Sequence, residues 1–139
     1  MKSLFLAVLF SSLFAMKSNA QGAPASATQA FSTSFPRAIK TNWTTVGKIY
    51  KAEFILDNEI QYAFFSKTGD FLVMANYIQF QDLPYKMRVG LIKQFPDHKI
   101  VEIFKAETET DTDYFVTLEK NNVRFVLKEL NGKWQLFKK

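Results

Sequence analysis

The apolar positions of this chain first recur with a helical period and then alternate with polar ones. Ala27, Ala30, Phe31 and Phe35 are spaced three and four residues apart, which predicts a short helix with one apolar side. Pro36 ends this helix, because proline disfavours the helical conformation of the residue before it. Three alternating stretches then predict an antiparallel meander of three strands with these inner residues: Tyr50, Ala52, Phe54 and Leu56; Ile60, Tyr62 and Phe64; Phe71, Val73, Ala75 and Tyr77.

The segment DLPYKMRVGLIKQFP predicts the clearest helix of the chain. Asp82 can cap its start, Pro84 suits its first turn, and Pro96 ends it. Its apolar stripe consists of Met87, Leu91, Ile92 and Phe95. Strands are predicted next in HKIVEIFKAE, YFVTLEK, VRFVLKEL and KWQLF, with turns at Asn121-Asn122 and Asn131-Gly132.

The second half of the chain repeats the order of the first. Phe35-Pro36 matches Phe95-Pro96 at an offset of 60 residues. The inner residues of the first strand match at an offset of 64, and those of the next two strands at 63: Tyr50, Ala52 and Phe54 with Tyr114, Val116 and Leu118; Ile60, Tyr62 and Phe64 with Val123, Phe125 and Leu127; Gly69, Phe71 and Val73 with Gly132, Trp134 and Leu136. We therefore expect two repeats, about 29–80 and 82–139, with a shared core and divergent outer faces.

The first residues and the composition predict an exported protein and indicate where its domain begins. Residues 1–20 carry a basic start, an apolar run and a small-residue end, which predicts a signal peptide cleaved after Ala20. Residues 21–28 are small and polar, as in a flexible leader, and residues 29–139 are expected to form one domain. No later segment is apolar enough to span a membrane, so we expect no membrane span after cleavage. There is no Cys, so stability has to come from a core. Of the 15 Phe of the chain, the 12 that remain after cleavage are suited to filling one.

The charge is mild once the signal peptide is removed. Without Lys2 and Lys17, 16 basic residues face 13 acidic ones, a net charge of +3. The basic residues are scattered instead of gathered in one run, so no nucleic-acid partner is expected.

A set of short motifs carries a family resemblance over roughly residues 28–137. They are a helix ending in Phe-Pro, a Trp, a strand headed by Tyr, a Gly turn and a Leu-Pro before the second helix, followed by the same pattern again: Phe35, Pro36, Trp43, Tyr50, Gly69, Leu83, Pro84, Phe95, Pro96, Tyr114 and Gly132. The chain resembles the PepSY-like and beta-lactamase-inhibitor-like (BLIP-like) family of exported bacterial domains. This resemblance implies an α+β fold, a tandem repeat of helix plus antiparallel meander forming one curved antiparallel sheet with helices packed on one face.

Candidate chemistry is sparse. His98 is the only histidine and follows a helix-ending proline, a position where a solvated residue is more common than a metal ligand or a base. The loop ETETDTD, residues 107–113, has four alternating carboxylates but lacks the glycine and closing glutamate of a calcium loop, so a solvated hairpin is favoured over a calcium site. We expect no catalytic residues, no metal and no cofactor, and hence not an enzyme.

The remaining hypothesis is binding. Apolar and basic residues of the parity opposite to the core, on the sheet face away from the helices, form the candidate partner-binding set: Ile55, Phe65, Met74, Phe115, Arg124 and Lys128. The resemblance suggests a protein partner in the periplasm or the medium, such as a secreted or cell-envelope enzyme that is inhibited or regulated. The alternative is a periplasmic domain that holds a small apolar ligand between sheet and helices.

Overall fold

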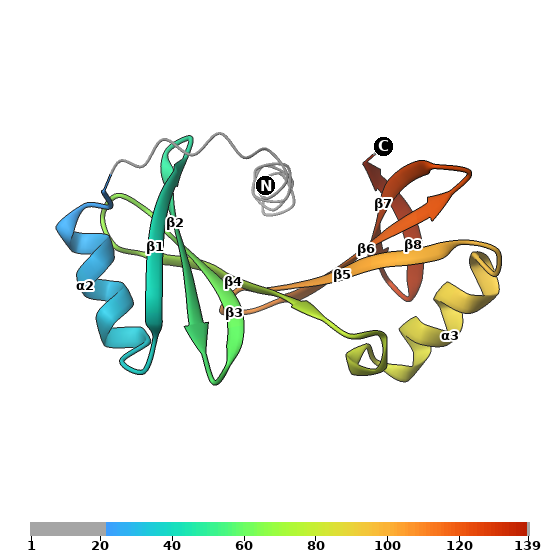
Figure 1. The fold of residues 1–139 in the computed structure, drawn as a ribbon, viewed down its shortest axis with the longest axis horizontal. Coiled ribbons are helices and arrows are strands. Elements are labelled where there is room, and N and C mark those ends of the chain that lie inside the picture. The colour runs from blue at the N-terminus through green and yellow to red at the C-terminus, as the bar shows by residue number, and fades with distance from the viewer. Residues whose placement is uncertain (1–21, 139) are drawn as a thin grey trace. The chain divides into compact units, whose positions relative to one another are not determined.

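The structure, a computed structural model, describes residues 22–138, so the predicted signal peptide lies outside the described residues (Figure 1). Its elements are, in chain order, α2 (Ala25–Ser34), β1 (Ile39–Val46), β2 (Ile49–Leu56), β3 (Glu59–Phe65), β4 (Phe71–Ile78), the 3-10 helix η1 (Phe80–Asp82), α3 (Tyr85–Gln94), β5 (Lys99–Glu107), β6 (Thr112–Lys120), β7 (Val123–Leu130) and β8 (Lys133–Lys138). Within residues 22–138, no helix is both long enough and apolar enough to cross a membrane.

The eight strands form one sheet in the order of the sequence, and neighbouring strands pair antiparallel. This confirms the predicted α+β class with an antiparallel sheet. The chain divides into two compact units, Met1–Val73 and Met74–Lys139, called unit 1 and unit 2 below. Among residues 22–138, α2 precedes β1 to β3 in unit 1, and α3 precedes β5 to β8 in unit 2. The repeat stays a prediction.

In unit 1, α2 packs its apolar side on the strands beside it. It begins at Ala25, so the predicted leader 21–28 is too long by its last four residues. Ala27 and Phe31 are buried, and Phe31 meets the Phe54 ring with 4.9 Å between centroids. At the end of the helix the Phe35 amide donates to the Phe31 carbonyl (2.8 Å) just before Pro36, as the Phe-Pro signal predicted.

The expected three-stranded meander of unit 1 missed one strand. Residues 39–46 form β1, an edge strand that pairs with β2. Its sequence, IKTNWTTV, is mostly polar and its first half is exposed, so it lacks the apolar alternation by which a half-buried strand is recognised. The strand at the equivalent place in unit 2 is β5, and it was predicted because IVEIF carries more apolar residues.

The predicted inner face of β3 is wrong. Asp57 and Asn58 both have positive φ and form a two-residue turn, which places Ala52 opposite Ala63 and Tyr50 opposite Phe65. Because partners directly opposite share a face, Ala63 and Phe65 join the α2 side, and the predicted set Ile60, Tyr62 and Phe64 lies on the other side.

The same turn in unit 2 uses Asn121 and Asn122, both again with positive φ. There Val116 lies opposite Leu127, so an offset of 64 residues relates the pair Ala52 and Ala63 to the pair Val116 and Leu127. The expected offset of 63 for this strand is therefore one residue short, which is enough to exchange the two faces of β3.

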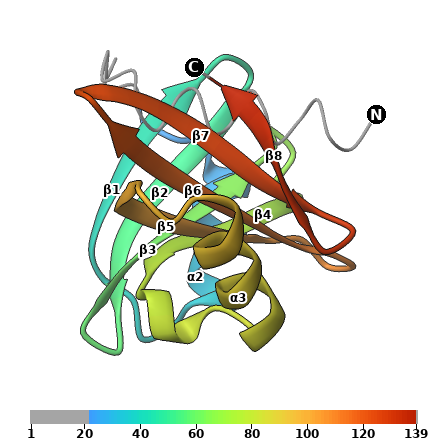
Figure 2. The same ribbon diagram turned by 90° about the vertical axis from the view of Figure 1, so that its right-hand side faces the viewer.

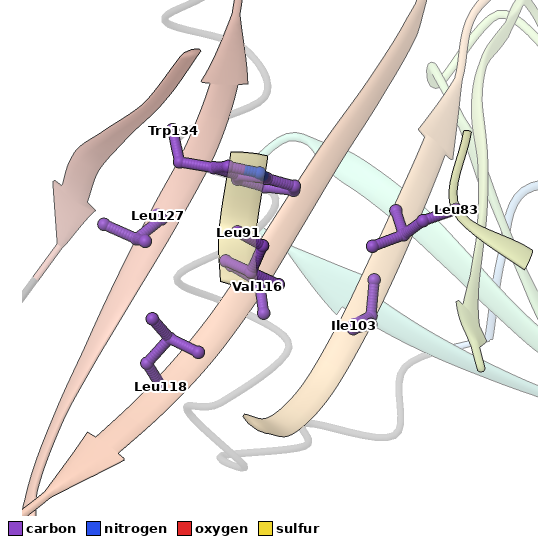
Figure 3. Packing of buried hydrophobic residues seen from close by; sticks show 7 residues of the cluster. All are labelled: Leu83, Leu91, Ile103, Val116, Leu118, Leu127 and Trp134. Carbon is purple, nitrogen blue, oxygen red and sulfur yellow. The ribbon is translucent and has the colours of Figure 1, made fainter. Parts of the chain in front are cut away.

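In unit 2, α3 covers a second apolar cluster. Figure 3 shows seven buried side chains of this cluster: Leu83, Leu91, Ile103, Val116, Leu118, Leu127 and Trp134. Leu91 points from α3 toward the strands, and Trp134 reaches α3 from β8, where its indole Nε1 donates to the Met87 carbonyl (3.0 Å). Figure 2 shows α3 running beside these strands.

Two details of α3 differ from the prediction. Ile92 is 56% exposed, because it follows the buried Leu91 by one residue and points about 100° away around the helix. Asp82 does not cap α3: it ends η1, where its carboxylate accepts from the Gln79 amide (2.9 Å). The residue before α3 is Pro84.

Two glycine positions give opposite expectations for the same substitution. Gly69 has φ of +90°, and an added Cβ would lie 2.7 Å from the Ser26 carbonyl oxygen; Gly69→Ala should therefore lower the unfolding free energy by about 1–3 kcal/mol. Gly90 lies inside α3, where an added Cβ would meet the Trp134 ring at an ordinary 3.7 Å. Gly90→Ala should raise the unfolding free energy by about 0.5–1 kcal/mol, because alanine favours helix.

Urea denaturation of both variants beside the parent protein checks these signs. Destabilisation by Gly90→Ala would contradict the local geometry in α3, and unchanged stability of Gly69→Ala would contradict the close approach to Ser26.

Candidate binding face

The six predicted partner-binding residues do not share one environment. Phe65 lies on the α2 side, completely buried with Phe31, Trp43 and Phe71 around its ring. The prediction that it lies on the face away from the helices is wrong, because the β3 register is shifted by one residue relative to the expected one. Phe115 does lie on the face away from α3, opposite Lys128, but it is only 1% exposed.

Lys128 belongs to the same buried group as Phe115. Its ammonium lies 3.2 Å from the Asp113 carboxylate and 5.6 Å from the centroid of the Phe115 ring. The Phe137 ring contacts Phe115 from β8, with 5.1 Å between centroids. Lys128 is 8% exposed, so removal of Asp113 would leave a poorly solvated charge. These residues therefore belong to the packed interior of unit 2, and their burial leaves little of them for a partner to contact.

Arg124 and Met74 lie nearer the solvent. Arg124 is exposed, and its Nε donates to the Glu119 carboxylate at 2.6 Å. This hydrogen bond is the main cause that lowers the pKa of Glu119. Met74 is half-buried in β4, opposite Glu107 of β5.

The open surface of unit 1 is the sheet face opposite α2. We define the unit 1 sheet face by five side chains of β2 and β3: Lys51, Glu53, Ile55, Ile60 and Tyr62. Cross-strand pairing places Glu53 opposite Tyr62 and Ile55 opposite Ile60. The Lys51 ammonium lies 5.6 Å from the centroid of the Tyr62 ring. Ile60 is 53% exposed, while Lys51, Ile55 and Tyr62 are half-buried.

This face combines an aromatic ring, a cation, a carboxylate and two apolar side chains. Aromatic and apolar anchors with charges around them are the usual make-up of a protein–protein contact patch. Of the predicted set, the unit 1 sheet face contains only Ile55. The sequence pattern predicted Tyr62 as an inner residue. The repeated two-residue turn, Asp57-Asn58 and Asn121-Asn122, was the signal that would have moved Tyr62 outward.

Lys51 gives a prediction about pH. Burial lowers the pKa of Lys51 below its ordinary value of 10.5, and the Glu53 carboxylate acts in the opposite direction. Because the folded pKa is below the unfolded one, the unfolded state binds more protons in the alkaline range, so folding stability gains from Lys51 deprotonation as the pH rises through the folded pKa.

Lys51→Met removes this titration. The stability of the parent relative to Lys51→Met should therefore increase between neutral pH and pH 10.5. Chemical denaturation of both proteins across this range measures the difference, in which the other titrating groups cancel. A difference that is constant with pH would show that burial does not disfavour the Lys51 ammonium.

The sequence features with possible chemistry, His98 and the acidic loop 107–113, show no metal-binding cluster in the part of the chain that the structure describes. Among residues 22–138, no three His, Asp or Glu side chains are close enough to hold a metal ion. His98 packs edge-on between the Phe95 and Phe125 rings, with centroid distances of 5.4 and 5.5 Å. The acidic loop closes on itself, since Thr108 donates from its amide to the Asp111 carbonyl (2.9 Å).

Comparison with known proteins gives matches at the level of structure. No protein-family profile and no curated protein sequence matches the chain. A solved structure from Bacteroides eggerthii, provisionally described as periplasmic, superposes with a TM-score of 0.78 at 14% identity, covering 85% of this chain and 90% of its own. A BLIP-like protein from Bacteroides fragilis superposes with a TM-score of 0.71 at 16% identity, covering 86% of each chain.

The chain has a BLIP-like fold. A DUF2874 family protein from Bacteroides uniformis has it too, with a TM-score of 0.76 at 11% identity over 84% of this chain and 88% of that one. The BLIP-like half of the resemblance found in the sequence is thereby confirmed for the fold, and the PepSY-like half stays a prediction. At these identities the likeness carries the architecture alone.

Proposed function

We propose that this protein is an exported, non-catalytic binding module that binds a protein partner through its unit 1 sheet face. The observation that carries the proposal is the arrangement of Lys51, Ile60 and Tyr62. A cation is held over a half-buried aromatic ring, beside an apolar side chain that is 53% exposed. The partially desolvated charge costs stability, and such a cost is understandable where the charge serves binding.

The BLIP-like fold supports the choice of a binding module over an enzyme. One solved structure of this fold is described as BLIP-like, that is, like a beta-lactamase inhibitor, and an inhibitor of this kind acts by binding. One protein of the same fold is provisionally described as periplasmic, which supports export to the periplasm or the medium. This agrees with the signal peptide predicted in residues 1–20. A secreted or cell-envelope enzyme, inhibited or regulated by this contact, is the partner class that fits an exported domain of this fold.

The alternative of a small apolar ligand buried between sheet and helix receives no support from the aromatic cluster of unit 1. The space under α2 is filled by aromatic rings in mutual contact, with Phe31 and Phe35 both 4.9 Å from the Phe54 ring centroid. Phe65 closes the same cluster from β3. A ligand there would have to displace packed core side chains.

The test compares capture by matched variants. The mature protein, immobilised as bait, is exposed to a periplasmic extract and to culture medium of the source organism. Ile60→Asp should lose the captured partner, by roughly tenfold or more in affinity, because it places a charge at an apolar anchor. Val123→Asp is the matched control: Val123 is 60% exposed near the start of β7, as Ile60 is near the start of β3.

Equal capture by Ile60→Asp and the parent would refute the unit 1 sheet face as the contact. Loss of capture by Val123→Asp alone would move the contact to unit 2. Thermal unfolding of each bait confirms that loss of binding is not loss of folding.

A further inference from the structure

A pocket opens in unit 2 where β4 leaves β5. The β4–β5 pairing ends at Ile78 opposite Ile103, and the chain then turns through Gln79 into η1. β5 continues back to Lys99 and is paired there with β6. The space beside this stretch is an open pocket of about 500 Å³, within the size range of ligand sites, and its lining includes Tyr77, Phe80, Ile100 and Glu102.

The pocket has an apolar, aromatic wall. Tyr77 is 42% exposed, and its ring is held edge-on by Phe104 with 5.3 Å between centroids. Ile100 is also partly exposed, and Phe80 rests against the core under α3. An aromatic face with apolar neighbours favours the alkyl stem of a ligand and attracts a cation.

The acidic group of the pocket is Glu102. One of its oxygens accepts a hydrogen bond from the Thr117 hydroxyl at 3.2 Å, and Thr117 is itself buried. No Lys or Arg of residues 22–138 lies within ion-pair distance of Glu102. The register of β5 shifts between Ile100 and Glu102, a bulge of the kind that redirects side chains at sheet edges. Glu102 is therefore fixed on one side and has acceptor capacity left on the other.

We propose that this pocket binds an ammonium or guanidinium group on an alkyl stem. The stem would lie against Ile100 and Phe80, the cation would face the Tyr77 ring, and the second oxygen of Glu102 would accept its hydrogen bond. A carboxylate and an aromatic face together recognise a cation, whereas a neutral chain of the same length gains only the apolar contact. The site is separate from the unit 1 sheet face, and it stands whether or not that face binds a protein.

The test uses defined probes and NMR of the isotope-labelled protein. Acetyl-lysine methylamide and acetyl-arginine methylamide are titrated beside their neutral counterparts, acetyl-norleucine methylamide and acetyl-citrulline methylamide. We expect the cationic probes to shift the backbone amides of residues 77–80 and 100–103, and the neutral ones to bind roughly tenfold or more weakly. Agmatine and a short extended peptide with a central arginine form two further arms, which distinguish a free cationic molecule from a side chain of a polypeptide.

Glu102→Gln keeps an acceptor for Thr117 and should weaken binding of the cationic probes to the level of the neutral ones. Glu109→Gln, in the exposed loop of the same unit, should bind them as the parent does. Salt gives a second measurement on the parent protein itself, since about 0.5 M NaCl should weaken the cationic probes and leave the neutral ones unchanged. Equal affinity for charged and neutral probes, or shifts that lie outside the pocket, would overturn the proposal.

Discussion

Replacing Phe65 with alanine is expected to lower the unfolding free energy by about 3–5 kcal/mol, the usual cost of removing a phenylalanine from a closed core. Phe65 has no exposed surface, and its ring lies 5.8 Å from the Phe71 centroid and 6.0 Å from that of Trp43. The cavity left behind would be bounded by rings from one helix and two strands, Phe31 of α2, Trp43 of β1 and Phe71 of β4, which cannot all move to close it. Urea denaturation followed by far-ultraviolet circular dichroism measures the loss.

The matched control is Ile60→Ala in the same strand. Ile60 is more than half exposed, so its truncation should change the unfolding free energy by less than about 1 kcal/mol. A larger loss at Ile60 than at Phe65 would return β3 to the register expected from the sequence and would remove the unit 1 sheet face.

Trp134→Ala is expected to have a similarly large effect on unit 2, a loss of about 3–5 kcal/mol. Trp134 ties β8 to α3 through its buried ring and through the hydrogen bond from Nε1 to the Met87 carbonyl at 3.0 Å. Trp134→Phe keeps most of the ring packing, so it should cost less than Trp134→Ala. Its remaining cost comes from the lost hydrogen bond and the smaller ring.

Leu136→Ala, two residues along the same strand, is the control for Trp134. Leu136 is largely exposed, and its truncation should leave stability within about 1 kcal/mol of the parent. If Trp134→Ala cost no more than Leu136→Ala, the packing of α3 on β8 would be incorrect.

The elements with strong local signals were predictable. The Phe-Pro pairs end α2 and α3, and the paired turn residues Asn121 and Asn122 join β6 to β7, because proline and positive-φ residues act through local sterics. The inner face of β6 and most of that of β7 were also correct, since Val116, Leu118 and Leu127 are buried under α3.

The sequence was ambiguous where both faces of a strand carry apolar residues. In β3, EIQYAFF offers Ile60, Tyr62 and Phe64 on one side and Ala63 and Phe65 on the other, so alternation alone could not choose between them. Cross-strand pairing with β2 decides the choice, and pairing depends on turn geometry instead of apolar content. Strand parity also cannot predict which outward side chains are exposed, and this affected the predicted binding residues. Phe115 has the outward parity that was expected, yet tertiary packing with Phe137 and Lys128 buries it.

The cost of the Lys51 charge agrees with the proposed role of the unit 1 sheet face. A binding face can hold a partly desolvated cation ready for a partner. If so, Lys51→Met should combine higher stability at neutral pH with weaker capture of the partner. This coupling separates a functional lysine from an incidental one.

The most direct measurement of the central proposal is site-specific photo-crosslinking. A benzoylphenylalanine residue is placed at Ile60 on the unit 1 sheet face or, as the matched position, at the exposed Thr33 of α2 in the same unit. Each protein is irradiated in the periplasmic fraction and in the culture medium. The proposal predicts one discrete crosslinked protein from position 60 and none from position 33; a discrete product from position 33 with none from position 60 would contradict it.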